Sequence, residues 1–166
     1  IKMQKKRIEF SYEEYSSIAE LNLTDRELVE QALVATTQAS AQFSKFHVGA
    51  AARLSDGQIY LGSNYENTSI TSCAEQELLS YLHALYRNFT IASLAVTFNN
   101  ANLGSRSDFP ITPCGKCRQL LLEAEITSGK PIRVIMAGQS GKVLIATGVA
   151  SMLPLAYSAE YINTQA

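Results

Sequence analysis

Apolar residues in the first third of the chain follow a helical period. Four of them recur every three or four positions, on what would be one face of a helix: Leu28, Ala32, Ala35 and Ala39. Thr24 and Glu27 precede this run at the spacing of a capping box, in which both side chains accept backbone N–H groups at a helix start. The pattern therefore predicts a helix over about 25–41.

After residue 46 the period changes to two, as expected of a strand. Alternate residues of this segment are apolar: Val48, Ala50, Ala52 and Leu54. Asp56-Gly57 follows, and this dipeptide favours a tight turn between antiparallel strands. We therefore predict a hairpin with strands over 47–54 and 58–61. Residues 62–72 are rich in Ser, Thr and Asn and are predicted to form a loop.

The rest of the chain alternates between helices and strands. A compact apolar run at 91–98 is typical of a buried strand. The other predicted elements are helices over 73–86 and 114–124, strands over 132–137 and 143–147, and a short last helix. This order predicts an α/β fold with a mixed sheet and helices on its faces. Residues 1–23 show no clean period, so we predict an N-terminal extension at 1–23 and one domain at 24–166.

Composition and charge restrict the classes of function. The 166 residues are 46% hydrophobic and 17% charged, as in an ordinary globular domain, and the formal net charge is −1. Without a basic surplus, a nucleic acid polymer is not an expected partner. No apolar run is long enough to span a membrane, and the basic residues 1–7 lead into no apolar signal segment. We therefore expect a cytoplasmic protein with no membrane partner.

The cysteines are the strongest chemical signal. The chain has three, and each is at or near the start of a predicted helix. They lie in the segments Cys73-Ala74-Glu75 and Pro113-Cys114-Gly115-Lys116-Cys117. A helix N-terminus favours thiolate over thiol. Three thiolates satisfy three positions of a tetrahedral zinc site and leave the fourth open for water, as in catalytic sites. We therefore predict one Zn²⁺ per chain, held by Cys73, Cys114 and Cys117.

Glu75 supplies the second part of this chemistry. It lies two residues after Cys73 in the same predicted first turn, so its carboxylate can reach a water at the metal without binding the metal. From there it can move a proton from the water to a ring nitrogen, and then to departing ammonia. A Cys-x-Glu segment followed by Pro-Cys-x-x-Cys is the three-cysteine form of a zinc deaminase motif. Glu75 is therefore the predicted catalytic residue.

On these motifs the chain resembles the cytidine deaminase family. The resemblance covers about residues 28–157, and its further landmarks are the segments 43–51, 56–57, 64–67 and 113–119. It implies a three-layer α/β/α sandwich around a five-stranded mixed sheet. It also implies hydrolytic deamination of a small nucleoside, cytidine and 2′-deoxycytidine, in pyrimidine salvage. Small family members with three cysteine ligands are homotetramers, so a homotetramer is the assembly that the resemblance implies.

The resemblance also assigns substrate-binding residues. Phe46 matches the aromatic residue that stacks on the pyrimidine. Asn64 and Glu66 match the pair that hydrogen-bonds the ribose, and Ala74 belongs to the same nucleoside site. Tyr157 stands where an aromatic residue of the C-terminal segment closes the site of a neighbouring subunit.

Two positions beside the cysteines bear on how the thiolate charge is offset. Many three-cysteine relatives have Arg directly after the catalytic Glu, and this chain has Gln76 there. Arg118 is a candidate partner for the thiolates, and an ordinary surface charge is an equal alternative for it. The loop from Asn67 to Cys73 is short, near the length in blasticidin S deaminases. Those enzymes lack the acidic residue that Glu66 provides, which favours cytidine.

Alternatives remain for the function and for single residues. Within the class, the rival is a deaminase of a modified cytosine nucleoside or a blasticidin-like antibiotic. A polynucleotide-editing deaminase is disfavoured by the neutral charge. The non-enzyme rival is a structural zinc or partner-binding module, against which Glu75 and the missing fourth ligand argue. Taken singly, Phe46 also fits a core position, and Tyr157 also fits plain interface packing.

Overall fold

A six-stranded mixed sheet forms the centre of the computed structural model, which describes residues 3–100 and 108–158. The strand order is β1-β8-β7-β6-β2-β3; β6 and β7 are parallel, and the other neighbours are antiparallel. The strands are β1 (Glu13–Tyr15), β2 (His47–Leu54), β3 (Ile59–Ser63), β6 (Ile91–Asn99), β7 (Arg133–Ala137) and β8 (Val143–Thr147). The predicted loop at 62–72 contains a separate ribbon of β4 (Tyr65–Glu66) and β5 (Thr71–Ser72).

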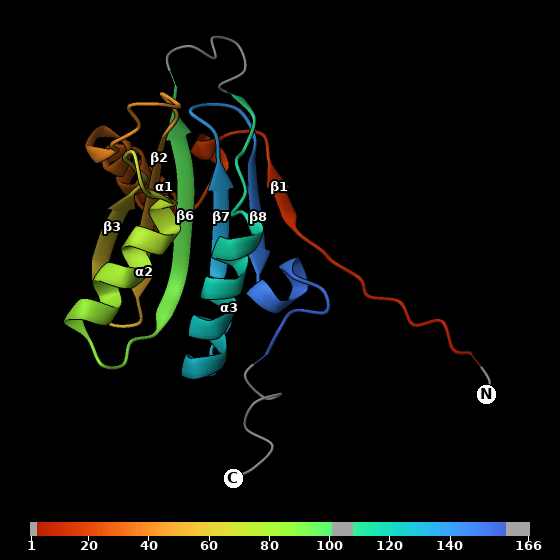
Figure 1. Cartoon of the computed structure of the whole chain (residues 1–166). Helices are drawn as coiled ribbons and strands as arrows, with labels where there is room; N and C mark the ends of the chain where they lie inside the picture. The colour runs from red at the N-terminus through yellow and green to blue at the C-terminus, as the bar shows by residue number, and fades with distance from the viewer. Residues whose placement is uncertain (1–2, 101–107, 159–166) are drawn as a thin grey trace.

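Helices cover both faces of this sheet. Figure 1 shows α2 (Ala74–Leu85) and α3 (Gly115–Ser128) in front of the sheet and α1 (Leu23–Ala35) behind it. Each face has its own buried cluster of apolar side chains, which explains why β6 carries apolar residues on both of its faces. The predicted α/β class and the three-layer arrangement are thus confirmed. None of the described helices is long and apolar enough to cross a membrane.

The prediction of five strands was wrong by one, because β1 lies within the N-terminal extension. β1 pairs with β8 and forms one edge of the sheet, and its residues are mostly polar, so no apolar alternation marks it in the sequence. Charged contacts hold it instead. Glu13 Oε1 accepts from Arg133 at 2.9 Å, and Glu14 Oε1 accepts from Lys142 at 2.6 Å. The domain boundary at residues 23/24 stays a prediction.

The first helix differs from its predicted limits at both ends. Asn22, not Thr24, is the N-cap: its Oδ1 accepts the backbone N–H of Asp25 at 2.9 Å. The α-helix ends at Ala35 rather than near residue 41 and continues as a 3-10 turn. The hydroxyl of Thr36 donates to Leu33 O at 2.7 Å, and this bond competes with continuation of the helix.

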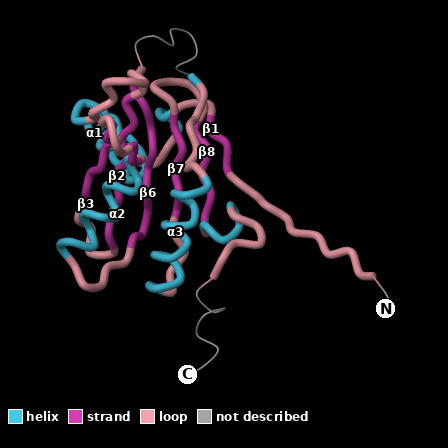
Figure 2. The backbone as a smooth tube through the Cα atoms, in the orientation of Figure 1, coloured by secondary structure: helices cyan, strands magenta, loops and turns pink. Residues whose placement is uncertain are grey.

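The second and third helices begin at the same end of the sheet. In Figure 2 both run away from the end at which β6 and β7 finish, as expected when a helix crosses over between parallel strands. α3 extends beyond its predicted end near residue 124 to Ser128, and the left-handed Gly129 (φ 65°) ends it. The carboxyl ends of two strands and the N-termini of two helices therefore meet in one place.

Candidate functional site

The three cysteines meet where α2 and α3 begin. Cys73 is the N-cap of α2 and Cys114 the N-cap of α3, and Cys117 lies in the first turn of α3. All three Sγ atoms lie within 4.8 Å of one another, and the Sγ atoms of Cys73 and Cys114 are 3.7 Å apart. Two segments 41 residues apart along the chain thus place three soft donors around one point.

Close packing of α2 on the sheet helps to position this cluster. Gly62 in β3 lies directly under the first turns of α2. A Cβ atom at this glycine would lie 2.6 Å from the carbonyl oxygen of Ala74 and 2.6 Å from the Cβ of Leu78. Any larger residue at position 62 would therefore push away the helix start that carries Cys73 and Glu75.

The electrostatics of the cluster fit a bound cation. Burial raises the pKa of the Cys117 and Cys73 thiols. Burial also opposes ionisation of Cys114, but hydrogen bonds from Cys117 and from the N–H of Lys116 lower the pKa of Cys114 overall. A divalent cation reverses the cost of crowded thiolates, since coordinated thiols are deprotonated. The set of three sulfurs within one coordination sphere therefore fits a single Zn²⁺.

Glu75 lies beside these sulfurs and is almost fully buried, with 4% of the residue exposed. Burial raises the pKa of its carboxyl group, and a hydrogen bond with Cys117 acts in the opposite direction. The carboxyl group borders a cavity of about 470 Å³ that Cys73 and Cys114 also line. A buried carboxyl group with a raised pKa at the wall of a cavity is a typical candidate for proton transfer.

Aromatic rings form another part of the cavity wall. Phe46 lines the cavity and stacks on the buried Phe98, with ring centroids 5.0 Å apart and an interplanar angle of 20°. Phe109 also lines it, and its ring is tilted by 31° against Phe98 at 5.1 Å. Phe109 was not among the predicted site residues, because it lies between the predicted strand at 91–98 and the predicted helix at 114–124 and belongs to neither. Its aromatic character, five residues before Cys114, was the available signal.

Asn64 and Glu66 occupy different places around the cavity. Asn64 lines it, while its Oδ1 accepts from Val48 N–H at 2.8 Å and its Nδ2 donates to Phe46 O at 2.9 Å. Glu66 is buried beside the cavity rather than in its wall. Its carboxylate accepts the hydroxyl of Ser44 and two backbone N–H groups, and these bonds lower the pKa of Glu66.

The remaining predicted residues are distributed around the site. Ala74 lines the cavity, whereas Gln76 and Arg118 lie outside it. The guanidinium of Arg118 donates to Pro113 O at 2.8 Å and to Met152 O at 2.9 Å, so it contacts carbonyl oxygens. These bonds join the loop before Cys114 to the 3-10 helix η4 (Val149–Met152). Tyr157 is 58% exposed and does not line this chain's own cavity.

Comparison with known proteins identifies relatives of the whole fold. Residues 23–129 match the family model of the cytidine and deoxycytidylate deaminase zinc-binding region. A cytidine deaminase of Halalkalibacterium halodurans is 33% identical over 138 residues, which cover 82% of this chain and 96% of the relative.

The similar solved structures are also of cytidine deaminases. The crystal structure of a cytidine deaminase from Burkholderia pseudomallei is similar with a TM-score of 0.67 and 33% identity, over 79% of this chain and 97% of that one. A cytidine deaminase structure from Mycobacterium tuberculosis is similar with a TM-score of 0.62 and 29% identity, over 82% and 99% of the two chains.

Proposed function

Because the chain belongs to the cytidine and deoxycytidylate deaminase family, we propose that it is a zinc-dependent hydrolase that converts cytidine and 2′-deoxycytidine to the uridine nucleosides and ammonia. The observation that carries this proposal is the meeting of three cysteine sulfurs and the buried Glu75 beside one cavity. A structural zinc module, the non-enzyme alternative, needs neither the cavity nor the buried carboxyl group.

Glu75 carries the protons in this reaction. Cys73, Cys114 and Cys117 hold one Zn²⁺, which supplies a Lewis acid that lets water ionise near neutral pH. Glu75 takes one proton of the water and delivers it to the ring nitrogen beside the amino-bearing carbon, to which the water oxygen bonds. The second proton of the water follows through Glu75 to the amino group, which leaves as ammonia. The raised pKa of Glu75 supports this role, because one group must gain and lose protons in turn.

Phe46, Asn64 and Glu66 bind the nucleoside. The ring of Phe46 is held on Phe98 beside the cavity, which suits it to stack on a pyrimidine. Asn64 lines the cavity and offers a second amide hydrogen and a second lone pair to the ribose. Glu66 uses three of about four acceptor positions on donors of Phe43 and Ser44, which leaves capacity for one ribose hydroxyl.

The proposed assembly is a homotetramer in the cytoplasm that serves pyrimidine salvage. Tyr157 is 58% exposed on the surface of one chain, which supports a role at a neighbour's site. Dilution into monomers should then lower activity, and light scattering at assay concentration should detect the tetramer.

One assay separates the candidate functions. Purified, zinc-loaded protein is incubated with cytidine, 2′-deoxycytidine, cytosine, cytidine monophosphate and a blasticidin-like antibiotic, and ultraviolet absorbance and ammonia are followed. We expect turnover of the two nucleosides well above that of the base and the nucleotide. Preferred turnover of the antibiotic would move the assignment to that rival. Zinc-loaded protein without any turnover would support the structural module.

A further inference from the structure

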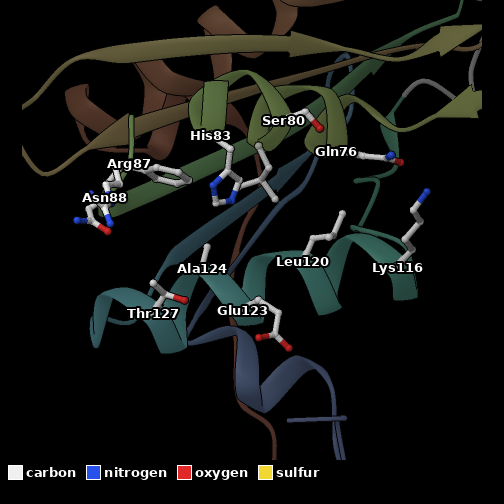
Figure 3. A pocket seen from close by; sticks show the side chains of 12 residues that line it. Gln76, Ser80, His83, Arg87, Asn88, Lys116, Leu120, Glu123, Ala124 and Thr127 are labelled. Atoms are coloured by element: carbon white, nitrogen blue, oxygen red, sulfur yellow. The ribbon is translucent and has the colours of Figure 1, made fainter. Parts of the chain in front are cut away.

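A second cavity, of about 280 Å³, lies between α2 and α3 on the face of the helix layer away from the sheet. Most of its lining residues come from the two helices, and Arg87, Asn88 and Phe89 of the loop after α2 line one end. Its lining also includes one residue from the first turn of each helix, Gln76 of α2 and Lys116 of α3. In Figure 3 both side chains extend toward the same end of this cavity. That end is the one at which the helices carry their cysteines.

The carbonyl oxygen of the Gln76 side chain lacks a partner. Gln76 Oε1 is buried and accepts no hydrogen bond within the described residues. Buried polar atoms in native proteins almost always have a partner, so an acceptor without one indicates that a donor is to be supplied. Lys116 is exposed, has three ammonium hydrogens and a flexible stem, and lines the same cavity.

The position of Lys116 is unusual for a cation. It lies in the first turn of α3, where the helix dipole disfavours positive charge. Within residues 3–100 and 108–158, Lys116 forms no ion pair with a carboxylate. A cation at such a position is favoured only if another negative charge lies close by. The three cysteines of the proposed metal site provide that charge once they are thiolates.

The charges around the site leave Lys116 as the compensating group. Zn²⁺ and three thiolates together carry a net charge of −1, and the first turn of α2 adds Glu75 and Glu77. Gln76 is neutral. Arg118 donates to carbonyl oxygens of the neighbouring loop and of η4. Among the first-turn residues of α2 and α3, Lys116 is therefore the cation that remains to offset the thiolates.

We propose that Gln76 Oε1 accepts a hydrogen bond from the Lys116 ammonium and so holds this positive charge between the starts of α2 and α3, where it offsets the net negative charge of a zinc ion bound by three cysteine sulfurs. Lys116 and Gln76 are thus a pair of positioning residues that act on the metal through charge. The inference rests on the zinc site of the proposed function, and it holds whichever cytosine compound is the substrate.

The test measures zinc affinity rather than turnover, so it stands apart from the substrate assignment. Lys116→Met is compared with wild type by competition with a chromophoric chelator at fixed pH and ionic strength. We expect a loss of about tenfold in zinc affinity, the lower end of the range for residues that support metal ligands. Lys116→Arg keeps the charge and is expected to stay within about twofold of wild type. Lys130→Met, an exposed lysine beyond the far end of α3, makes the same change in net charge and is expected to leave the affinity unchanged.

A double-variant cycle tests the role of Gln76. Gln76→Met is expected to weaken zinc binding, and Lys116→Met is expected to add little further loss in that background. Circular dichroism of the zinc-loaded variants checks that all are folded. Wild-type affinity in Lys116→Met, equal losses in Lys116→Met and Lys130→Met, or equal losses in Lys116→Met and Lys116→Arg would each overturn the proposal. Fully additive losses in the double variant would overturn the pairing with Gln76.

Discussion

The two halves of the proposed site are held in place by different means. We call Cys73, Glu75, Cys114 and Cys117 the metal half, and Phe46, Asn64 and Glu66 the sugar half. Members of the metal half lie at or near the first residue of a helix, so a few neighbouring residues determine their positions. Members of the sugar half depend on hydrogen bonds across the sequence, which span 16 residues for Asn64 and Val48 and 23 for Glu66 and Phe43.

In the metal half, the residue proposed for catalysis does not hold the fold. In the sugar half, the residues proposed to bind substrate also hold the fold. Within residues 3–100 and 108–158, the carboxyl group of Glu75 bonds with its own backbone N–H and with Cys117 rather than with the sheet or a loop, so its replacement should change the reaction alone. Asn64 and Glu66 hold the segment around Phe46 with the same polar groups that are proposed to bind ribose. Replacing either should therefore change both substrate binding and stability. The predictions below test this contrast.

Loss of a metal ligand should have the largest effect. Cys117→Ala removes one of three sulfurs from a buried position, and two remaining thiols are a poor site for zinc. We expect zinc content to fall from about one per chain to near zero, with no measurable deamination. Metal analysis of the purified protein measures this. His83→Gln, on α2 but outside the cysteine cluster, should keep its zinc. A fully zinc-loaded Cys117→Ala protein would contradict the ligand set.

Replacing Glu75, the proposed proton carrier, should stop the reaction but keep the protein folded and metal-loaded. We expect Glu75→Gln to lower kcat by about 10²–10⁴-fold or more, because one group handles both proton transfers. Zinc content and the unfolding midpoint should stay near those of wild type. Glu77→Gln in the same turn is the matched control, since Glu77 accepts from Ser72 and borders no part of the cavity. High kcat in Glu75→Gln would exclude the proposed role.

Replacing Glu66 in the sugar half should weaken both substrate binding and stability. Glu66→Gln removes the charge that accepts hydrogen bonds from Phe43 and Ser44. We expect KM for cytidine to rise by roughly tenfold, about the value of one hydrogen bond to a charged group, with a smaller change in kcat. The urea midpoint should fall as well. A rise in KM with an unchanged midpoint would show that the loop does not need Glu66, and would remove the contrast between the halves.

Replacing Phe109, which was not a predicted site residue, should have a smaller effect. Phe109→Leu keeps an apolar side chain but removes an aromatic contact with Phe98 at the cavity wall. Such contacts are worth about 0.5–1.5 kcal/mol, so we expect KM to rise by about 2–10-fold with zinc content unchanged. Phe43→Leu is the control, because Phe43 is exposed and does not line the cavity. Equal effects of the two substitutions would show that Phe109 has no special place at the site.

The same contrast explains what the sequence could predict. Helix starts are local, so the cysteine spacing alone indicated that Cys73 and Cys114 begin helices, and the apolar patterns located β2, β6, β7 and β8. β1 could not be predicted, because ion pairs with distant residues hold its polar side chains. The hydrogen bonds of Glu66 to the loop at 43–44 follow from the tertiary fold and leave no local signal. Arg118 likewise could not be assigned to carbonyl oxygens before the position of η4 was known.

The smallest expected effect is on the pH dependence of stability, and it belongs to the sugar half. Hydrogen bonds from Ser44 and Phe43 lower the pKa of Glu66 below its ordinary value of 4.5. The unfolded chain therefore takes up this proton at a higher pH than the folded chain. The stability that the carboxylate contributes is complete well above pH 4.5 and is lost as the pH falls through the lowered pKa.

Urea midpoints of wild type and Glu66→Gln should thus differ most near pH 7 and converge below pH 4.5. Subtracting the two curves removes the similar contribution of Glu13, whose pKa is lowered mainly by its hydrogen bond with Arg133. A difference that stays constant as the pH falls from 7 to 3 would show that ionisation of Glu66 contributes nothing to stability, and the charged hydrogen bonds would then not be what holds the sugar half together.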